Sequence, residues 1–390
     1  MSLSIAYVNY GEQSGVTTQV TRALVERGHR VTPVDAFGDL DLRDRRTRLP
    51  RPTPTVLAHL ALAAARFRGR ALAHRINTPF AFDLHSRRAG EALAALRPAP
   101  DVVLQNGALF APGRPPRLPY VLLLDHTRAL GMRARPFPEA GLLPPVDYGP
   151  EWREREARTY RGARALATFS ANAARSLDDD YGVDPNRVTV VGAGANVFPA
   201  RAPRDDDGRT IVFVGREFAR KGGLVLLDAF ARLRARFPGA RLLVAGPPAL
   251  TGVTLPPGAE LLGPVPYDAL PALFARATAF ALPTLQEPFG IAYLDAMACG
   301  VPCVGTAIEA VPEILRQGEC GLLVPPGDPA ALAEALGALL ADPARARAMG
   351  AAGRARVEGW YRWEHVAARL ERVLLDAAGR REITRPAGPR

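Results

Sequence analysis

The apolar positions in the first part of the chain alternate between two periods. Residues 4–10 form a short apolar run that predicts a buried strand, and a glycine-containing loop follows at 11–15. Beyond the loop, Val16, Val20 and Leu24 recur at the spacing of one helix face, and a strand pattern then resumes. A strand, a loop, a helix and a second strand in this order predict the start of a parallel α/β sheet.

Both halves of the chain repeat this alternation, and a polar segment separates them. In the first half, strands are also predicted at 101–105, 120–125, 165–170 and 187–192, and helices at 151–162 and 171–181. In the second half, strands are predicted at 210–215, 241–246, 260–263, 279–283, 302–306 and 321–325, and helices at 222–236, 268–276, 290–299, 312–318, 331–342, 343–357 and about 360–378. We therefore expect an α/β fold of two Rossmann-like, doubly wound domains, at 1–200 and 210–359, with a linker at 201–209 and a flexible tail at 379–390. Ligands of such sheets bind at the carboxyl ends of the strands, so the cleft between two facing sheets is the expected site.

The stretch at 43–75 departs from this alternation. Residues 43–54 are basic and rich in proline, and residues 55–75 have the pattern of a basic amphipathic helix. One interpretation is a surface helix packed on the N-terminal sheet. The other is a face that rests on an anionic membrane.

Composition narrows the class of protein. The 390 residues are 48% hydrophobic and 23% charged, which is typical of a globular protein. Cys299, Cys303 and Cys320 lie in apolar stretches and are expected to be buried thiols, since neither a disulfide framework nor a metal-ligand spacing is present. The N-terminus lacks a signal-peptide pattern, and no apolar run reaches the ~18 residues that span a bilayer. We expect a cytoplasmic protein, peripheral at the inner face of the membrane if the basic helix touches lipid.

Charge adds two observations. The formal net charge of +11 suits phosphorylated small molecules, anionic lipid or nucleic acid, but no nucleic-acid recognition motif supports the last of these. Lys221 is the only lysine among the 50 lysine and arginine residues. A compact ammonium kept at one position suggests a role that a planar guanidinium does not serve.

The loop at 214–223, Val-Gly-Arg-Glu-Phe-Ala-Arg-Lys-Gly-Gly, follows a predicted strand and opens a predicted helix. Gly215 lets a ligand approach the backbone closely, and the helix N-terminus offers unpaired N–H groups. Arg216 and Lys221 add two cations, so the loop suits a diphosphate. It is not a Walker A loop, because the order G-x4-G-K-[ST] is absent. The alternative is an exposed, charged junction without a ligand.

The loop at 283–291, Pro-Thr-Leu-Gln-Glu-Pro-Phe-Gly-Ile, has the same strand–loop–helix context. Glu287 stands just before the helix, and Asp295 lies on its second turn. A carboxylate accepts two O–H bonds, which suits the diol of a sugar. The alternative is that Glu287 only favours the helix dipole and Asp295 faces solvent.

Together the two loops resemble glycosyltransferase family 4, the retaining GT-B enzymes of the glycosyl transferases group 1. The matching tracts are FVGREFARKGG at 213–223, EPFGIAYLDAMACGVPCVGT at 287–306 and PEILRQGECGLLVPPGD at 312–328. The resemblance covers the C-terminal half and is looser before it, where the segment around Gly15 resembles the family's acceptor-side loop. It implies two facing domains and a C-terminal helix, near Trp360 and Trp363, that crosses back to the first domain.

The resemblance also implies roles for residues. Arg216 and Lys221 would hold the donor diphosphate and stabilise the charge on the leaving phosphate. Glu287 would bind hydroxyls of the transferred sugar, and His126 would reach that sugar from the N-terminal domain, unless it is a structural histidine. The other donor contacts would come from Gly215, from Val265 near the base, from the backbone at Phe289, Gly290 and Ile291, and from Asp295 at the ribose.

The implied reaction moves a hexose from a nucleotide diphosphate sugar, with retention, to an acceptor hydroxyl. The leaving phosphate itself takes the acceptor proton, and neither a metal nor another cofactor is expected. The acceptor is a carbohydrate, a lipid or a small molecule, and no role for nucleic acid is expected.

Three positions depart from the family pattern. Asp295 is one methylene shorter than the usual glutamate, which weakens or water-bridges the expected ribose contact. Residues 308–311 stand where the family often has a pair of glycines, and Ser14 replaces the usual partner of Gly15. At each of these positions the contact that the resemblance implies would differ from the family pattern.

Two functions of other classes compete. A non-catalytic sugar-nucleotide or carbohydrate binder of the same fold is one, although Arg216, Lys221 and Glu287 are all present. A Rossmann oxidoreductase would use Gly-Ala-Gly-Ala-Asn-Val at 192–197, but this segment lacks the third glycine and the acidic residue about 20 positions later.

Overall fold

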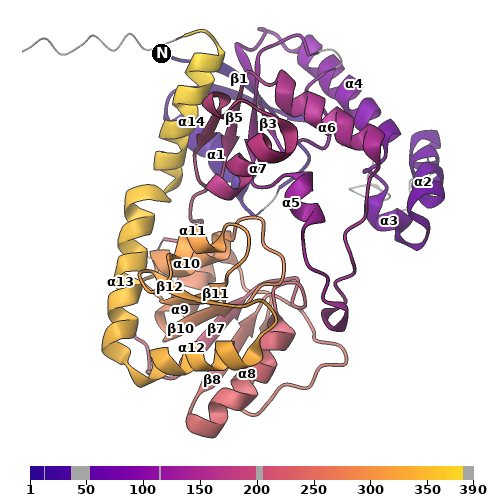
Figure 1. The fold of residues 1–390 in the computed structure, drawn as a ribbon. Coiled ribbons are helices and arrows are strands. Elements are labelled where there is room, and N and C mark those ends of the chain that lie inside the picture. The colour runs from indigo at the N-terminus through magenta and orange to yellow at the C-terminus, as the bar shows by residue number, and fades with distance from the viewer. Residues whose placement is uncertain (13, 37–52, 114–115, 199–204, 381–390) are drawn as a thin grey trace, which may run out of the picture.

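A computed structural model describes residues 1–12, 14–36, 53–113, 116–198 and 205–380 of the chain. Two six-stranded parallel sheets face each other, each flanked by helices (Figure 1). The first has the order β2 (Arg30–Asp35), β1 (Ser4–Asn9), β3 (Val102–Asn106), β4 (Tyr120–Leu124), β5 (Ala165–Thr168), β6 (Val188–Val190). The second has the order β12 (Gly321–Val324), β11 (Cys303–Thr306), β10 (Ala279–Leu282), β7 (Thr210–Val214), β8 (Arg241–Ala245), β9 (Ala259–Gly263). The prediction of two doubly wound domains is confirmed.

Helices connect and cover the strands. In the first domain they are α1 (Val16–Glu26), α2 (Pro54–Phe67), α3 (Ala71–His74), α4 (Pro79–Ala95), α5 (Arg128–Met132), α6 (Pro150–Gly162) and α7 (Ala171–Tyr181). In the second they are α8 (Gly223–Arg236), α9 (Leu270–Ala275), α10 (Ile291–Ala298), α11 (Val311–Leu315), α12 (Pro329–Ala341) and α13 (Pro343–Trp360), and α14 (Trp363–Ala377) ends the described chain. Short 3-10 turns lie at Arg68–Arg70, Pro138–Ala140, Pro185–Arg187 and Tyr267–Ala269.

The central strands of both sheets are buried on both faces, which explains their continuous apolar runs. All residues of β3, β4 and β10 are buried. One face of the first sheet packs under α1 and α14, and that core continues into the second domain. The three cysteines are free and buried in the second domain, as predicted.

Helix α4 was not predicted from the sequence. It begins with Thr78 as its N-cap, whose hydroxyl accepts a hydrogen bond from the N–H of Ala81 at 3.1 Å. Its buried face includes two polar side chains: His85 Nδ1 lies 3.0 Å from the Ala36 carbonyl oxygen, and Ser86 donates to the Phe82 carbonyl oxygen. Because polar residues stand at buried positions, the apolar period that would predict a helix is broken.

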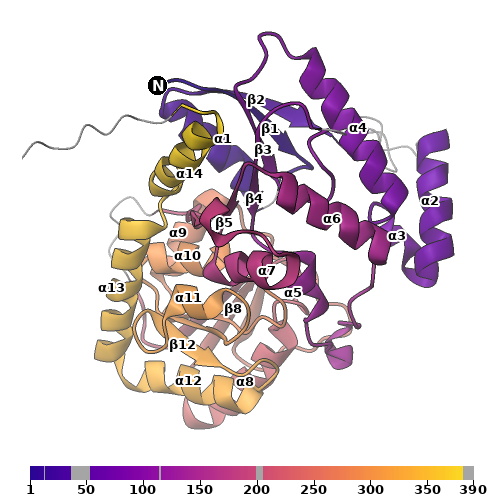
Figure 2. The same ribbon diagram turned by 45° about the horizontal axis from the view of Figure 1, so that its top comes forward.

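The expectation of one surface helix at 55–75 packed on the N-terminal sheet is wrong. The stretch is divided into α2 and α3 by a turn at Arg68, whose φ is +50°. Phe67, on the buried side of α2, belongs to a separate hydrophobic cluster. In that cluster it is joined by Phe82 of α4 and Trp152 of α6, and no strand residue of the described chain takes part. Helix α2 accordingly lies at the outer edge of the first domain (Figures 1 and 2). Of the proline-rich part, residues 43–52 lie outside the described residues.

The chain crosses between the domains twice, and the two crossings run side by side. The amide of Ala195 donates to the Tyr361 carbonyl oxygen at 2.8 Å, and the Trp363 indole donates to Asn196 Oδ1 at 3.1 Å. Trp363 is buried and is the first residue of α14, which packs back against α1. Trp360 instead is 41% exposed, under the guanidinium of Arg369. Of the predicted linker and tail, residues 201–204 and 381–390 are outside the described part of the chain.

Residues 133–149, between α5 and α6, also connect the domains, because they reach from the first domain to the second; we call them the cross-domain loop. Its turn is closed by reciprocal backbone hydrogen bonds between Phe137 and Leu142, at 2.8 and 3.0 Å. Phe137 is buried against Leu285 of the second domain, and a Cβ added to Gly327 would lie 2.8 Å from its ring. The loop therefore docks the first domain onto the second (Figure 1).

Candidate active site

The loop after β7 brings Gly215, Arg216 and Lys221 to the carboxyl edge of the second sheet. Gly222 has φ +75° and caps α8. A Cβ added to Gly222 would lie 1.8 Å from the carbonyl oxygen of Pro283, which belongs to the loop after β10. The two predicted loops are therefore in backbone contact, and only glycine fits at this position.

Lys221 and Glu287 form an ion pair across these loops. The Lys221 ammonium donates to Glu287 Oε2, and the two side chains are only 16% and 6% exposed. The neighbouring backbone holds the pair in place, because the N–H of Leu285 donates to the Arg220 carbonyl oxygen at 2.9 Å and the Arg220 guanidinium donates to the Gln286 carbonyl oxygen at 2.7 Å. The structure thus brings the cation of the first motif to the first acid of the second.

The remaining residues of the two motifs have different surroundings. Burial raises the pKa of Tyr267, which lies two residues after Val265, and the charge of the exposed Arg216 opposes that shift. Gly290 has φ +110° and caps α10, which starts at Ile291. Phe289 is buried at the junction between the domains, with its ring 5.5 Å from that of Phe169. Its side chain therefore serves packing, which leaves its backbone as the part available to a ligand.

Asp295 is buried and turned toward the first crossing. Its Oδ1 accepts from the N–H of Asn196 at 2.6 Å and from the N–H of Val197 at 3.1 Å. Burial raises the pKa of this carboxyl group to about 7, against the lowering effect of the two backbone hydrogen bonds. The alternative of a solvent-facing Asp295 is wrong, and the ribose contact stays a prediction.

Asn196 connects four segments of the chain. Besides its contacts with Asp295 and Trp363, its side-chain amide donates to the Ser14 carbonyl oxygen at 2.7 Å. A Cβ on Gly15 would lie 2.9 Å from this amide. Gly194 leaves the room that the Trp363 ring fills, since an added Cβ would lie 2.5 Å from that ring. The segment at 192–197 is thus a junction between the domains.

His126 contacts Glu309 of the second domain. The sequence did not single out the side chain of Glu309. His126 Nε2 lies 3.2 Å from Glu309 Oε1, and Glu309 Oε2 accepts from the N–H of Glu287 at 2.5 Å. Glu309 has φ +49°, a conformation that favours glycine. The missing glycine pair at 308–311 was the signal that could have found it. Behind His126, burial raises the pKa of Asp125.

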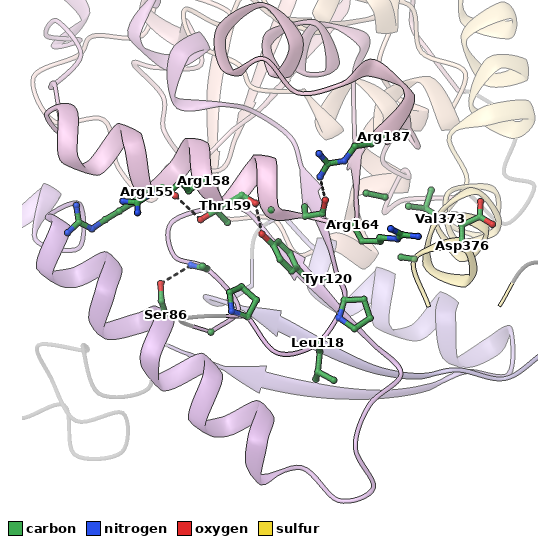
Figure 3. A pocket seen from close by; sticks show the side chains of 18 of the residues that line it. Ser86, Leu118, Tyr120, Arg155, Arg158, Thr159, Arg164, Arg187, Val373 and Asp376 are labelled. Carbon is green, nitrogen blue, oxygen red and sulfur yellow. Dashed lines mark hydrogen bonds between the residues drawn. The ribbon is translucent and has the colours of Figure 1, made fainter. Parts of the chain in front are cut away.

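One large cavity lies away from this site. It measures about 930 Å³ and lies at the amino ends of β4 and β5, beside Tyr120 and α6 (Figure 3). Of its arginines, Arg155 is paired with Asp83, at 2.9 and 3.0 Å, and Arg187 donates to the Ala163 carbonyl oxygen. The Lys221–Glu287 pair, in contrast, lies at the carboxyl ends of strands, where ligands of doubly wound sheets bind.

No group of three or more His, Cys, Asp and Glu residues in the described part of the chain could hold a metal ion. Nor does any helix within it combine the length and the apolar character that crossing a membrane requires.

Comparison with known proteins gives matches of two kinds. Residues 208–342 match the family described as "Glycosyl transferases group 1". A D-inositol 3-phosphate glycosyltransferase of Frankia alni is 34% identical over 234 residues, which are 53% of this chain and 58% of the relative. The match thus spans just over half the length of that curated relative.

Solved structures match over nearly the whole chain. A sucrose-phosphate synthase from Thermosynechococcus elongatus has a TM-score of 0.69 at 19% identity, covering 95% of this chain and 98% of its own. Anabaena HepE in complex with UDP and glucose has a TM-score of 0.59 at 15% identity, covering 95% of this chain and 99% of its own. At these identities the likeness shows the GT-B fold. With the family match, it follows that the segment from 208 to 342 belongs to the glycosyl transferases group 1.

Proposed function

We propose that the chain is a retaining glycosyltransferase that moves a hexose from a nucleoside diphosphate sugar to an acceptor hydroxyl. The observation that carries this proposal is the buried Lys221–Glu287 pair, formed where two glycine-capped helices begin. An ammonium beside a carboxylate at two helix N-termini offers contacts for a diphosphate and for sugar hydroxyls in one place.

In the proposed reaction, the bond between the anomeric carbon and the phosphate oxygen breaks. The acceptor oxygen bonds to the same face of that carbon, and its proton passes to the departing phosphate. Lys221 and Arg216 stabilise the negative charge that develops on the phosphate. Glu287 and His126 orient the sugar through its hydroxyls, so no cofactor or metal enters the proposal.

UDP-glucose is the first donor to test, because the Anabaena protein of the same fold was solved with UDP and glucose. A bound donor should raise the melting temperature of the protein, since it binds only the folded state. With donor bound, slow transfer of glucose to water gives an activity that needs no acceptor.

We predict that Lys221→Ala lowers this hydrolysis by about 100-fold or more, the usual effect of removing one donor to a developing oxyanion. Arg232→Ala is the matched control, because Arg232 is an exposed α8 residue paired with Asp228. Equal hydrolysis by Lys221→Ala and wild type would refute the assigned role. Melting shifts without any hydrolysis by the wild type would favour the non-catalytic binder.

We also propose that the protein acts in the cytoplasm and touches an anionic membrane through α2 and α3. Leu57 and Leu72 are 55% and 59% exposed there, and Arg66, Arg68 and Arg75 flank them. Exposed leucines beside arginines are the composition of helices that lie in a bilayer interface.

A further inference from the structure

A second cavity, of about 360 Å³, lies between the domains and is lined by the chain neighbours of Lys221 and Glu287. Arg70, His74 and Arg128 line it from the first domain, and Arg220, Gln286 and Glu309 line it from the second. Arg220 and Gln286 are the chain neighbours of Lys221 and Glu287. The returning arm of the cross-domain loop completes the wall.

The charges of Arg70 and Arg128 are directed at neutral partners. Arg70 Nη1 donates to the Pro144 carbonyl oxygen at 2.8 Å. The Arg128 guanidinium lies 4.0 Å from the centre of the Tyr148 ring and donates to the Val146 carbonyl oxygen. Its Nε is buried and has no hydrogen-bond partner among the described residues. Neither arginine is neutralised by an ion pair within the described part of the chain.

Few acids lie near this cavity, and those that do are engaged in other contacts. Glu309 is the one acidic residue on its described walls, and both of its oxygens are bonded, to His126 and to the N–H of Glu287. Glu156 lies behind Arg128, and burial raises the pKa of its carboxyl group to about 7, which weakens it as a counter-charge. The pKa of His74 is lowered, first by burial and then by the charges of Arg70 and Arg128. Arg70 and Arg128 therefore outnumber Glu309, the one acid on the described walls, and the cavity keeps an excess of positive charge.

We propose that this cavity is the subsite for an acceptor that carries a phosphate monoester, which Arg70 and Arg128 bind. The assignment rests on the proposed function. A phosphate monoester carries a charge of about −1.5 to −2 at neutral pH and so can satisfy two arginines, whereas a carboxylate carries one. Guanidinium groups bind phosphate oxygens in pairs, and the volume falls in the range of small-molecule sites. An acceptor held here presents its hydroxyls next to Glu287.

Calorimetry with glucose 6-phosphate, glucose and glucuronate tests this subsite. Saturating UDP is present, so that phosphate groups do not enter the donor loop. The wild type should bind glucose 6-phosphate at least ten times more tightly than glucose or glucuronate. Arg70→Gln should lose at least five-fold of that affinity, and Arg68→Gln, on the same turn but outside the cavity, should lose none. Glycerol 3-phosphate and inorganic phosphate, titrated in the same way, cover acceptors whose body is not a hexose.

These measurements test the phosphate subsite and the proposed glycosyltransferase activity independently of each other. If none of the three phosphate compounds gives binding that depends on Arg70 but not on Arg68, the subsite is refuted, while UDP-glucose hydrolysis by the wild type still supports the proposed function. Arg70-dependent phosphate binding without donor binding or hydrolysis would retain the anion site and refute the enzyme. To distinguish a lipid from a soluble source, the wild type and Arg70→Gln are compared on vesicles containing phosphatidic acid, a phosphate monoester, and on vesicles containing phosphatidylglycerol, a phosphate diester. Binding that Arg70→Gln loses only on phosphatidic acid indicates a lipid source.

Discussion

Asp295, predicted to contact the ribose of the sugar nucleotide, is bound by the protein's own backbone. Its carboxylate is held by the backbone of Asn196 and Val197, which belong to the other domain. Its pKa of about 7 lies above the ordinary value of 3.8, so the folded state binds a proton that the unfolded state has released between these pH values. Its contribution to stability is therefore fully present below about pH 4 and is lost as the pH rises to 7.

Asp295→Asn should remove this pH dependence, because an amide oxygen can accept the same two hydrogen bonds without ionising. The difference in unfolding free energy between the variant and the wild type should grow in favour of the variant from pH 4 to 7, by at most about 1.4 kcal/mol per pH unit. Urea unfolding at four pH values measures it. Because Glu156 titrates in both proteins, its effect cancels in the difference between their unfolding free energies. If the two free energies changed with pH in parallel, Asp295 would not be the cause.

At this scale the sequence predicted Lys221 and Glu287 as site residues, but neither their ion pair nor its surroundings. Lys221 stood out as a single lysine, and Glu287 as an acid before a helix. Glu309 and Asn196 could not be found in the same way, because each acts through contacts with residues more than 20 positions away. The missing glycine pair at 308–311 was the signal at Glu309. It indicated a difference in the backbone there, not a role for the Glu309 side chain.

Among the elements, the cross-domain loop has no repeating pattern that would predict its place. Periodicity identifies helices and strands, whereas this loop is ordered by the burial of Phe137 against the other domain. Helix α4 was missed for a related reason, because its buried face carries His85 and Ser86. The strands of both sheets were found, since burial on both faces leaves a strong apolar signal.

Phe137→Ala should release the cross-domain loop. Truncating a buried phenylalanine typically costs about 3–5 kcal/mol, and here the loss falls on a single docking contact. We expect faster proteolysis within 133–149 and slower donor hydrolysis, with the overall melting temperature changed less. Glu139→Ala, at the exposed turn of the same loop, is the control. Unchanged proteolysis in Phe137→Ala would show that other contacts hold the loop.

For the whole molecule, the fold class and the return of the last helix followed from the sequence and its family resemblance. The junction of the domains did not, because its contacts, such as that between Asn196 and Trp363, join residues far apart in the sequence. The segment at 192–197 looked like a weak cofactor loop, and its glycines instead make room for that junction.

The position of the molecule on a membrane is testable at this scale. The double variant Leu57→Ser, Leu72→Ser should bind vesicles of phosphatidylglycerol and phosphatidylcholine several-fold more weakly than the wild type in sedimentation, because it loses the apolar part of the contact. Val25→Ser, at an exposed position on α1, is the control. Vesicles of pure phosphatidylcholine should bind neither protein, and equal binding of the double variant and the wild type would rule out this face.

The ammonium of Lys221 has one more consequence. Apart from the amino terminus, it is the sole primary amine of the protein. Reductive methylation with carbon-13 formaldehyde would therefore place an NMR label in the ion pair without any engineered mutation. Its chemical shift would report directly when a donor displaces Glu287 from that nitrogen.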